Sequence, residues 1–378
     1  MATDIHSKPF DEGTQIKLQI VRDYLKEWLP VFIMKKVPTW KKLFIYDFFA
    51  GEGSDTVGNY GSPLIILDEI RKYCNAIQEK EMLVKIVLNE YSEKKTERLK
   101  KSCADYIDTC RASLKHDSLS CKEDGNCVFH LVFENQDFQD FFGSIYSTMQ
   151  NLSDYPRFIF LDQYGVRHVT KEVFNKLLAL VRTDFIFFIS SSYVHRFVEN
   201  PEFQKYIDLE RKDFDGKNLY QCHRVLFDYY KSLSELNHTK IYLAPFSIKK
   251  GKNVYGLIFG SHHKLGIEKF LKVCWSQNPQ TGDANFDIDN QKINSSEPKL
   301  FPDQDVPRKV EMFENELQRK IYMKELKTNI DVYDFTFDFG MLPSHANKVI
   351  RNLISKGKVA EGVKLSSSNI HKLEETSL

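Results

Sequence analysis

An acidic residue and two glycines follow a short apolar run near the start of the chain, in the order Asp47-Phe-Phe-Ala50-Gly51-Glu-Gly53. Glycines at a turn let the backbone approach a ligand closely, and a carboxylate accepts hydrogen bonds from polar ligand groups. The pattern Gly-x-Gly is a weak signal by itself, because an ordinary turn between a strand and a helix looks the same. It gains weight only if other residues converge on the same place.

Two further carboxylates end later apolar runs. Glu90 closes the run LVKIVLNE, and a carboxylate there can bind both hydroxyls of a ribose. Asp137 lies at the end of the next run, 126–138, where it would meet the exocyclic amine of an adenine. Three successive runs that end in carboxylates are hard to ascribe to solvated loops. The sequence therefore predicts a site for a nucleoside-containing cofactor, formed by Asp47, Ala50, Gly51, Gly53, Glu90 and Asp137.

NAD and S-adenosylmethionine are the two cofactors that such a site suggests. The dinucleotide fingerprint is G-x-G-x-x-G, and this chain has Thr56 where the third glycine would stand. The missing glycine favours S-adenosylmethionine.

A fourth run ends in Asp162-Gln163-Tyr164-Gly165. In amino-methyltransferases this place carries [DN]-P-P-[YF], whose acid and backbone carbonyl hold the target amine while the ring stacks on the base. We predict Asp162 as the catalytic acid and Tyr164 as the stacking ring, which would also receive a base flipped out of a duplex. Gln163 replaces the first proline, and the ring comes one position early. The alternative is that Asp162 only caps the turn after it.

These residues need a scaffold that brings the ends of several strands together. Five apolar runs of strand character alternate with helical patterns. They span residues 43–47, 83–90, 126–138, 157–165 and 184–192. Such alternation predicts an α/β fold with a parallel sheet and helices on both faces. After a mostly helical insert at about 196–238, residues 240–248 and 253–263 predict a hairpin. Seven strands with a terminal antiparallel hairpin are the Rossmann-like architecture of class I S-adenosylmethionine-dependent methyltransferases.

Residues 1–275 would form this domain, opened by a helix over 14–33 that Thr14 could cap. Residues 276–306 are rich in Asn, Asp, Ser and Pro and predict a linker that isolates the C-terminal part of the chain. Residues 307–378 carry three helical patterns and a short chain end, with Pro343 near the start of the third helix. That order is typical of a winged helix-turn-helix.

Local charge indicates nucleic acid as a partner. The whole chain has a net charge of only +1, but residues 239–275 carry seven lysines against Glu268, and residues 340–372 carry six Lys or Arg against Glu361. Clustered cations bind phosphates through counterion release. On the third helix we predict His345, Lys348, Arg351 and Lys356 as nucleic-acid contacts. Winged helices also serve as protein docking modules, and that alternative stays open.

Composition excludes several other classes. With 42 % hydrophobic and 13 % aromatic residues among 378, the chain can build a core. No apolar run approaches the ~20 residues needed to cross a membrane, and the first residues hold acids where a signal peptide would be apolar. The seven cysteines are odd in number and irregularly spaced, which fits free thiols in a reducing cytoplasm. Cys103, Cys110, Cys121 and Cys127, with His116 and His130 nearby, lack the pairwise spacing of a zinc site, so no metal is predicted.

Several of these motifs together resemble one family, the three-Cys-motif partner proteins, a methyltransferase-like group linked with a phage-type three-Cys-motif protein. The resemblance lies in Thr14-x-x-Lys17-Leu18 with YLKEW, YDFFAGEG, the GSPL of 61–64, FIFLDQYG, and VYGLIFGSHHKLG with the tryptophan at 275. It covers most of residues 10–275, and the C-terminal segment fits as well.

The resemblance implies that Asp47, Gly51, Gly53 and Glu90 belong to the cofactor site and Asp162 to the reaction centre. The family usually has D-P-[FY]-G where this chain has Asp162-Gln163-Tyr164-Gly165. It also implies a three-Cys-motif partner and a setting of phage conflict or mobile elements. The leading hypothesis is an S-adenosylmethionine-dependent methyltransferase of nucleic acid. The alternative is a non-catalytic sensor that binds a nucleotide and regulates a partner.

Overall fold

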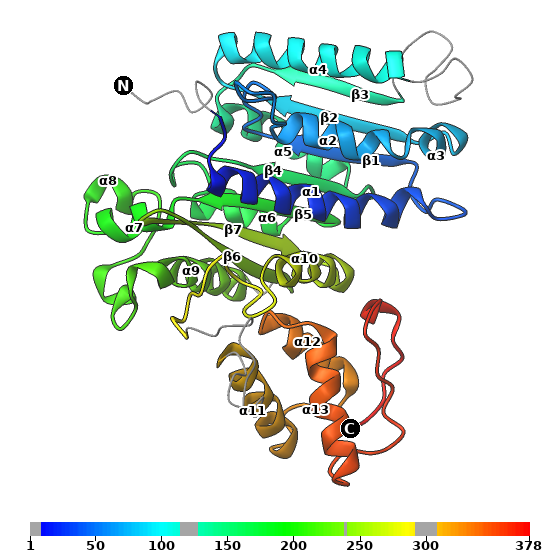
Figure 1. The fold of residues 1–378 in the computed structure, drawn as a ribbon, viewed down its shortest axis with the longest axis vertical. Coiled ribbons are helices and arrows are strands. Elements are labelled where there is room, and N and C mark those ends of the chain that lie inside the picture. Colours follow the sequence, from blue (N-terminus) through cyan, green and yellow to red (C-terminus); the bar gives the residue numbers. More distant parts are fainter. Residues whose placement is uncertain (1–8, 114–127, 238–239, 292–307) are drawn as a thin grey trace.

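The computed structural model describes residues 9–113, 128–237, 240–291 and 308–378. Its centre is a seven-stranded sheet in the order β3-β2-β1-β4-β5-β7-β6 (Figure 1). The first five strands are parallel, and β7 runs antiparallel to both β5 and β6. This confirms the class I methyltransferase architecture expected from the sequence.

The strands follow the apolar runs closely. They are β1 (Lys42–Asp47), β2 (Leu83–Asn89), β3 (Phe129–Glu134), β4 (Arg157–Leu161), β5 (Thr183–Ile189), β6 (Tyr242–Lys250) and β7 (Asn253–Ser261). The helices around them are α1 (Glu12–Ile33), α2 (Ser62–Arg71), α3 (Cys74–Glu79), α4 (Glu93–Ser113), α5 (Phe138–Asn151), α6 (Lys171–Leu178), α7 (Ser191–Phe197), α8 (Pro201–Gln204), α9 (Cys222–Leu236) and α10 (Lys264–Gln277).

Two hydrophobic cores lie on the two faces of the sheet. Side chains alternate along each strand, so Leu43 and Ile45 of β1 enter one core while Phe44 and Tyr46 enter the other. The first core is closed by α1, α2, α4 and α10, and the second by α5, α6 and α9. Because both faces are covered, only the ends of the strands are left to carry chemistry.

Helix α1 begins two residues earlier than the sequence indicated. Its N-cap is Asp11, whose carboxylate accepts a hydrogen bond from the Thr14 N–H at 3.0 Å, and Thr14 itself lies inside the helix. An aspartate caps a helix as well as a threonine does, so the helix begins at the earlier of the two candidates, Asp11.

The C-terminal helices are α11 (Arg308–Tyr322), α12 (Asn329–Asp338) and α13 (Pro343–Ser355), with Pro343 in the first turn of α13 as predicted. After α13 the chain does not form a β-hairpin. Residues 356–378 return as an irregular segment with a short 3-10 turn at Ile370–Lys372 and one antiparallel bridge between Thr328 and Ser377. This segment stands where the wing of a winged helix would be.

The C-terminal domain is not isolated from the sheet, contrary to the sequence-based expectation. Residues 278–291, the first half of the predicted linker, pack on the sheet domain: Ala284 bridges to Ser247 of β6, and Ile288 is buried. The Trp275 indole of α10 donates to the Gly340 carbonyl at 3.0 Å, and the Tyr242 hydroxyl of β6 donates to Asp334 of α12 at 2.8 Å. The domain therefore sits against α10 and β6, below the sheet in Figure 1. Composition missed this because Ala284 and Ile288 are the only buried hydrophobic residues of the polar segment 278–291.

Candidate active site

A pocket of about 290 Å³ opens where the parallel strands end. The turn after β1, the end of β2, the segments after β4 and β5, and the start of α1 all line it. Of the residues predicted from the sequence, the pocket collects Ala50, Gly51, Gly53, Glu90, Asp162 and Tyr164. The sheet topology thus brings together residues that lie more than a hundred positions apart in the chain.

The turn after β1 depends on its two glycines. Gly51 and Gly53 have φ angles of 65° and 90°, which a side chain disfavours. A Cβ added to Gly53 would also lie 2.9 Å from the Cβ of Ser102 on α4. Glu52 between them pairs with Arg98 of the same helix at 2.8 Å. The turn is therefore held tightly against α4, with its backbone exposed to the pocket.

Asp47 lies at the end of β1 and is 1 % exposed. One oxygen, Oδ1, accepts the Phe49 N–H at 3.2 Å, whereas Oδ2 is buried without a hydrogen bond of normal geometry to any described residue. Burial raises the pKa of Asp47 to about 7; hydrogen bonds from the Ser62 side chain and the Phe49 N–H oppose the shift, and the negative charges of Asp162 and Glu90 add to it. Asp47 does not line the pocket, whereas Ser62 does, so the carboxyl acts on the pocket through its charge and through Ser62.

Glu90 follows β2 and joins it to the glycine turn. Its Oε2 accepts the Gly51 N–H at 3.1 Å, and its Oε1 accepts the Ser92 N–H at 2.9 Å. Each carboxylate oxygen keeps a second lone pair, so Glu90 can still accept two hydroxyls from the pocket. The neighbouring Ala50 N–H donates to the Asn89 carbonyl at 2.9 Å, which fixes the same turn to β2.

Asp137 does not line the pocket. It is the N-cap of α5, and its Oδ1 accepts the Gln139 N–H at 2.8 Å. The cap accounts for an acid at this position without a ligand. Phe49 lines the pocket instead of Asp137. Its ring stacks on that of Phe138, with 5.0 Å between the ring centroids. It gives the pocket an apolar wall beside the end of β3.

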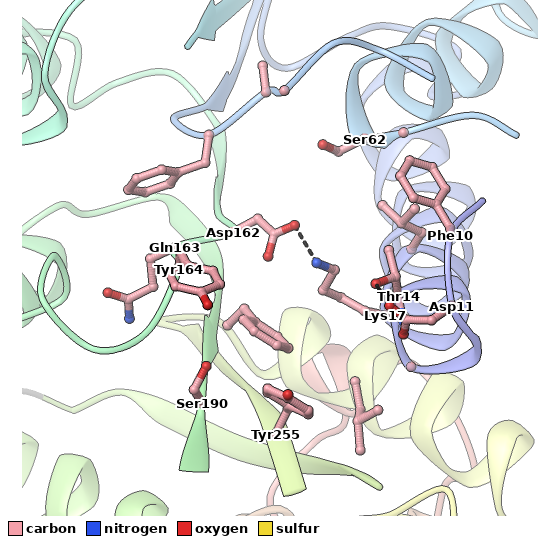
Figure 2. Close-up of a pocket in the computed structure, with 18 of the residues that line it drawn as sticks. Phe10, Asp11, Thr14, Lys17, Ser62, Asp162, Gln163, Tyr164, Ser190 and Tyr255 are labelled. Atoms are coloured by element: carbon pink, nitrogen blue, oxygen red, sulfur yellow. Dashed lines mark hydrogen bonds and ion pairs between the residues drawn. The ribbon is translucent and has the colours of Figure 1, made fainter. Parts of the chain in front are cut away.

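Asp162 follows β4 and faces into the pocket, where the ammonium of Lys17 from α1 donates to its Oδ2 (Figure 2). The Lys17 ammonium also lies 4.6 Å from the centroid of the Phe188 ring. Among the described residues no backbone N–H of the following turn donates to Asp162, so the structure gives no support to the capping alternative. Asp162 instead forms half of an ion pair on the pocket wall.

The two residues after Asp162 play different parts. Gln163 is buried, and its Oε1 accepts the N–H groups of His168 and Val169 at 3.0 and 3.1 Å, so it organises the loop that a proline stiffens in related motifs. Tyr164 is 79 % exposed at the mouth of the pocket, so one face of its ring is available to a ligand.

The first of the two basic runs is largely neutralised by acids from distant segments. Lys240 and Lys264 pair with Asp334, and both Lys269 and Lys272 pair with Glu27. Residues 239–275 therefore do not form the continuous cationic surface that the sequence indicated.

The second run keeps exposed cations on α13 and at its C-cap. Arg351 and Lys356 are exposed and have no ion-pair partner within the described parts of the chain, and Lys348 is exposed but pairs with Glu314 at 2.9 Å. The opposite face of the helix is buried through Val349 and other apolar side chains.

His345 does not lie on the exposed face of α13. Its Nδ1 accepts the Leu342 N–H at 3.1 Å, and its ring lies 4.4 Å from that of Trp275 on α10. Burial against the sheet domain lowers the pKa of His345, which favours the neutral ring. Its place is in the contact between the domains.

Neither a metal cluster nor a membrane span is found among the described residues. Within ranges 9–113, 128–237, 240–291 and 308–378, no group of three or more His, Cys, Asp or Glu could hold a metal ion. Cys121, Cys127 and His116 lie outside these ranges. No helix in them is both long enough and apolar enough to pass through a bilayer.

Comparison with known proteins supports the C-terminal assignment. Residues 284–360 match the family model of the GMT-like wHTH domain. The sequence matches no curated protein.

Solved structures resemble the chain only distantly. Trm1 from Pyrococcus horikoshii, solved with S-adenosyl-L-methionine, is 11 % identical with a TM-score of 0.39, over 82 % of this chain and 87 % of that one. A human methyltransferase 10 domain containing protein is 11 % identical with a TM-score of 0.31, over 65 % of this chain and 83 % of that one. The METTL16 methyltransferase domain is 11 % identical with a TM-score of 0.28, over 63 % of this chain and 66 % of that one. Similarity at this level has no bearing on activity, and the chemistry rests on the geometry of the pocket.

Sequence reasoning missed the most unusual member of the pocket, Lys17. Although it belongs to the motif Thr14-x-x-Lys17, a lysine on an amphipathic helix is ordinarily a solvated residue. The only signal was that its neighbours Leu18 and Val21 are apolar, which places it at the edge of the buried face.

Proposed function

We propose that this chain transfers the methyl group of S-adenosylmethionine to a nucleic acid. The observation that carries the proposal is the pocket at the carboxyl ends of the strands, which is lined together by the glycine turn, the bridging Glu90 and Asp162. The strand order, with β7 antiparallel, is the one in which such a pocket holds this cofactor.

The residues present fit the chemical groups of S-adenosylmethionine. Its amino group is a cation, and the buried carboxyl of Asp47, at the end of β1 next to the glycine turn, would supply a negative charge that attracts it. Its ribose has two hydroxyls, and Glu90 has one open lone pair on each oxygen beyond the Gly51 and Ser92 hydrogen bonds. The ring of Phe49 gives an apolar surface for the adenine. When bound, the cofactor supplies an activated methyl group on a sulfonium.

The chain's own residues would act mainly by position. The Lys17–Asp162 pair lines the same pocket as the glycine turn, so it could orient a substrate group towards the cofactor. Such alignment supplies much of the acceleration in a two-substrate reaction. Tyr164 at the mouth offers its ring for stacking on a base.

The nucleic-acid part of the proposal is supported by α13. Arg351 on the third helix and Lys356 at its C-cap present two exposed cations, and this helix is the element that meets a groove or a backbone in such domains. Lys348 is a weaker candidate because Glu314 already holds it.

Calorimetry followed by a transfer assay tests this function. We expect the full chain to bind S-adenosylmethionine and to move a tritiated methyl group onto total RNA or DNA. Asp162→Ala should leave the cofactor affinity within a few fold and abolish transfer, because Asp162 pairs with Lys17 on the pocket wall and makes no hydrogen bond with the glycine turn among the described residues. If the cofactor does not bind, or if binding leads to no transfer onto nucleic acid, the proposal is wrong.

A second candidate function is a non-catalytic sensor of the same cofactor. Two observations favour it: Lys17 already occupies Asp162, and Gln163 replaces the proline of the amino-methyltransferase motif. A sensor would bind S-adenosylmethionine as tightly as an enzyme but transfer no methyl group to RNA, DNA or a partner protein.

The family resemblance adds a partner to the proposal. We propose that the chain works in the cytoplasm with a three-Cys-motif protein in phage defence or mobile-element conflict. Co-expression of this chain with such a protein, followed by size-exclusion chromatography, tests the pairing. Separate elution of the two chains would refute it.

A further inference from the structure

A buried ammonium stands where the acceptor group would be held. Lys17 is 7 % exposed, and its Nζ donates to Asp162 Oδ2 on the pocket wall (Figure 2). The ring of Phe188, with its centroid 4.6 Å away, closes one side of the ammonium. Within the described parts of the chain its one hydrogen-bond acceptor is Asp162, so two of the three protons of the –NH₃⁺ group are left for a ligand in the pocket.

Helix α1 holds Lys17 in place from both directions. At its start, the cap residue Asp11 pairs with Lys250 at the end of β6, 2.6 Å away. Further along, the buried Tyr24 hydroxyl donates to Asp184 of β5 at 2.7 Å. Lys17 is thus part of the pocket wall, not a surface side chain folded inward.

The donor character of this pair selects the acceptor atom. An exocyclic base amine acts only as a donor, so it could pair with a remaining lone pair of Asp162 but has no lone pair to accept from the Lys17 ammonium. The N–H groups of an amine would face those of the ammonium, and two donors cannot form a hydrogen bond with each other. An oxygen nucleophile is complementary instead, because its lone pairs accept from the ammonium.

The geometry points to an oxygen as the methyl acceptor and, within a nucleic acid, to the 2′-hydroxyl of RNA. This inference rests on the proposed function. The 2′-hydroxyl is the group that distinguishes RNA from DNA, and every nucleotide within an RNA strand carries it. With a base on Tyr164 at the mouth, the attached ribose would enter the pocket towards Lys17.

The step balances without a further reactant. The 2′-oxygen forms a bond to the methyl carbon as the carbon–sulfur bond breaks, and that electron pair stays on sulfur, which becomes a neutral thioether. The hydroxyl proton leaves to water. Lys17 remains protonated, donates to the oxygen and stabilises the negative charge that grows on it. Asp162 keeps the ammonium aimed at that oxygen.

Product analysis with the wild-type chain tests the inference directly. Total RNA and a DNA of matched sequence are incubated with tritiated S-adenosylmethionine, and the labelled RNA is hydrolysed in alkali. A 2′-O-methyl group blocks cleavage of the adjacent phosphodiester, so we expect the label in alkali-stable dinucleotides and none on DNA. Label in mononucleotides, or transfer to DNA, would mean a base acceptor and would overturn this inference while leaving the proposed function intact. No transfer to either would overturn both.

A variant series separates positioning from folding. We expect Lys17→Met to lower kcat about 10²–10³-fold, the usual loss when a charge-stabilising donor is removed. KM for RNA and the calorimetric affinity for S-adenosylmethionine should stay within about threefold of wild type. Lys17→Arg keeps a cationic donor and should recover part of kcat. Lys26→Met, on the exposed face of the same helix, is the matched control and should behave as wild type. Equal kcat in the Lys17→Met and Lys26→Met variants would overturn the role of Lys17.

Discussion

The buried carboxyl of Asp47 predicts a pH-dependent stability that one substitution should remove. Its pKa is raised from 3.8 to about 7 chiefly by burial, so between these values the folded chain keeps a proton that the unfolded chain has lost. The contribution of the protonated carboxyl to the free energy of unfolding is therefore fully present below pH 4. It falls between pH 4 and pH 7 and is lost at higher pH. A shift of about three units is worth about 4 kcal/mol above pH 8. Because Asp47 is 1 % exposed, solvent screening removes little of this.

Asp47→Asn should recover most of that free energy at high pH only. Asparagine is neutral at every pH and its Oδ1 can still accept the Phe49 N–H. For 378 residues the entropy of unfolding is about 0.8 kcal/mol/K, so 4 kcal/mol corresponds to a rise in Tm of about 5 °C.

Differential scanning calorimetry of the wild type and the Asp47→Asn variant, without ligand, at pH 5 and pH 8.5 measures the effect. We expect the variant to gain about 5 °C at pH 8.5 and less than half of that at pH 5. The reasoning about burial fails if the variant gains equally at both pH values or melts lower than wild type at pH 8.5. The variant should bind S-adenosylmethionine more weakly, because the substitution removes the negative charge that attracts the amino group of the cofactor.

Three further outcomes are expected from contacts in the structure. Gly53→Ala should destabilise the chain by about 2–3 kcal/mol in urea unfolding. Alanine disfavours the φ of 90° at this position, and its Cβ would clash with Ser102. Arg351→Ala combined with Lys356→Ala should lower the log–log salt slope of nucleic-acid binding by about two in a gel-shift titration, with cofactor affinity unchanged. Trp275→Ala should cost about 3–5 kcal/mol and lower the Tm of the whole chain, because this side chain joins the two domains.

Matched variants control each of these experiments. Gly58 also has a positive φ but has open space around its Cβ position, so Gly58→Ala carries the backbone cost without the clash. Lys41 and Lys205 are exposed lysines far from α13 in the sequence, and replacing both should leave the salt slope unchanged. Trp275→Phe keeps an aromatic ring and loses only the hydrogen bond to Gly340, so a cost as large as that of alanine would contradict the packing argument.

The scaffold could be predicted from the sequence because its signals are local. A strand buried on both faces is a continuous apolar run, and the acids Glu90 and Asp162 directly follow such runs. The order of the strands came from the known architecture that this alternation matches. The residues of the glycine turn were found because positive φ needs glycine, a property of single positions.

The parts that sequence reasoning missed depend on partners far along the chain. Lys17 meets Asp162 across 145 positions, and nothing in either local pattern marks the pairing. The lysines of 239–275 looked like a cationic surface because their acids, Asp334 and Glu27, come from other segments. His345 was placed on the outer face of α13 by helical spacing, which says which side chains share a face but not where another domain will cover it.

The hydrophobic core beneath α1 does not stop at the domain boundary. Side chains of β6, β7 and α10 belong to one contiguous cluster with Phe313 of α11 and Val349 of α13. A chain built in this way should unfold in a single calorimetric transition, and a fragment cut before α11 would expose apolar surface that it never shows in the intact protein. Recombination could not easily exchange this helix-turn-helix for another, because a replacement would need to rebuild the same apolar seam. Its evolutionary history is therefore expected to follow that of the sheet, and a ligand that tightens the pocket should also slow hydrogen exchange in α13.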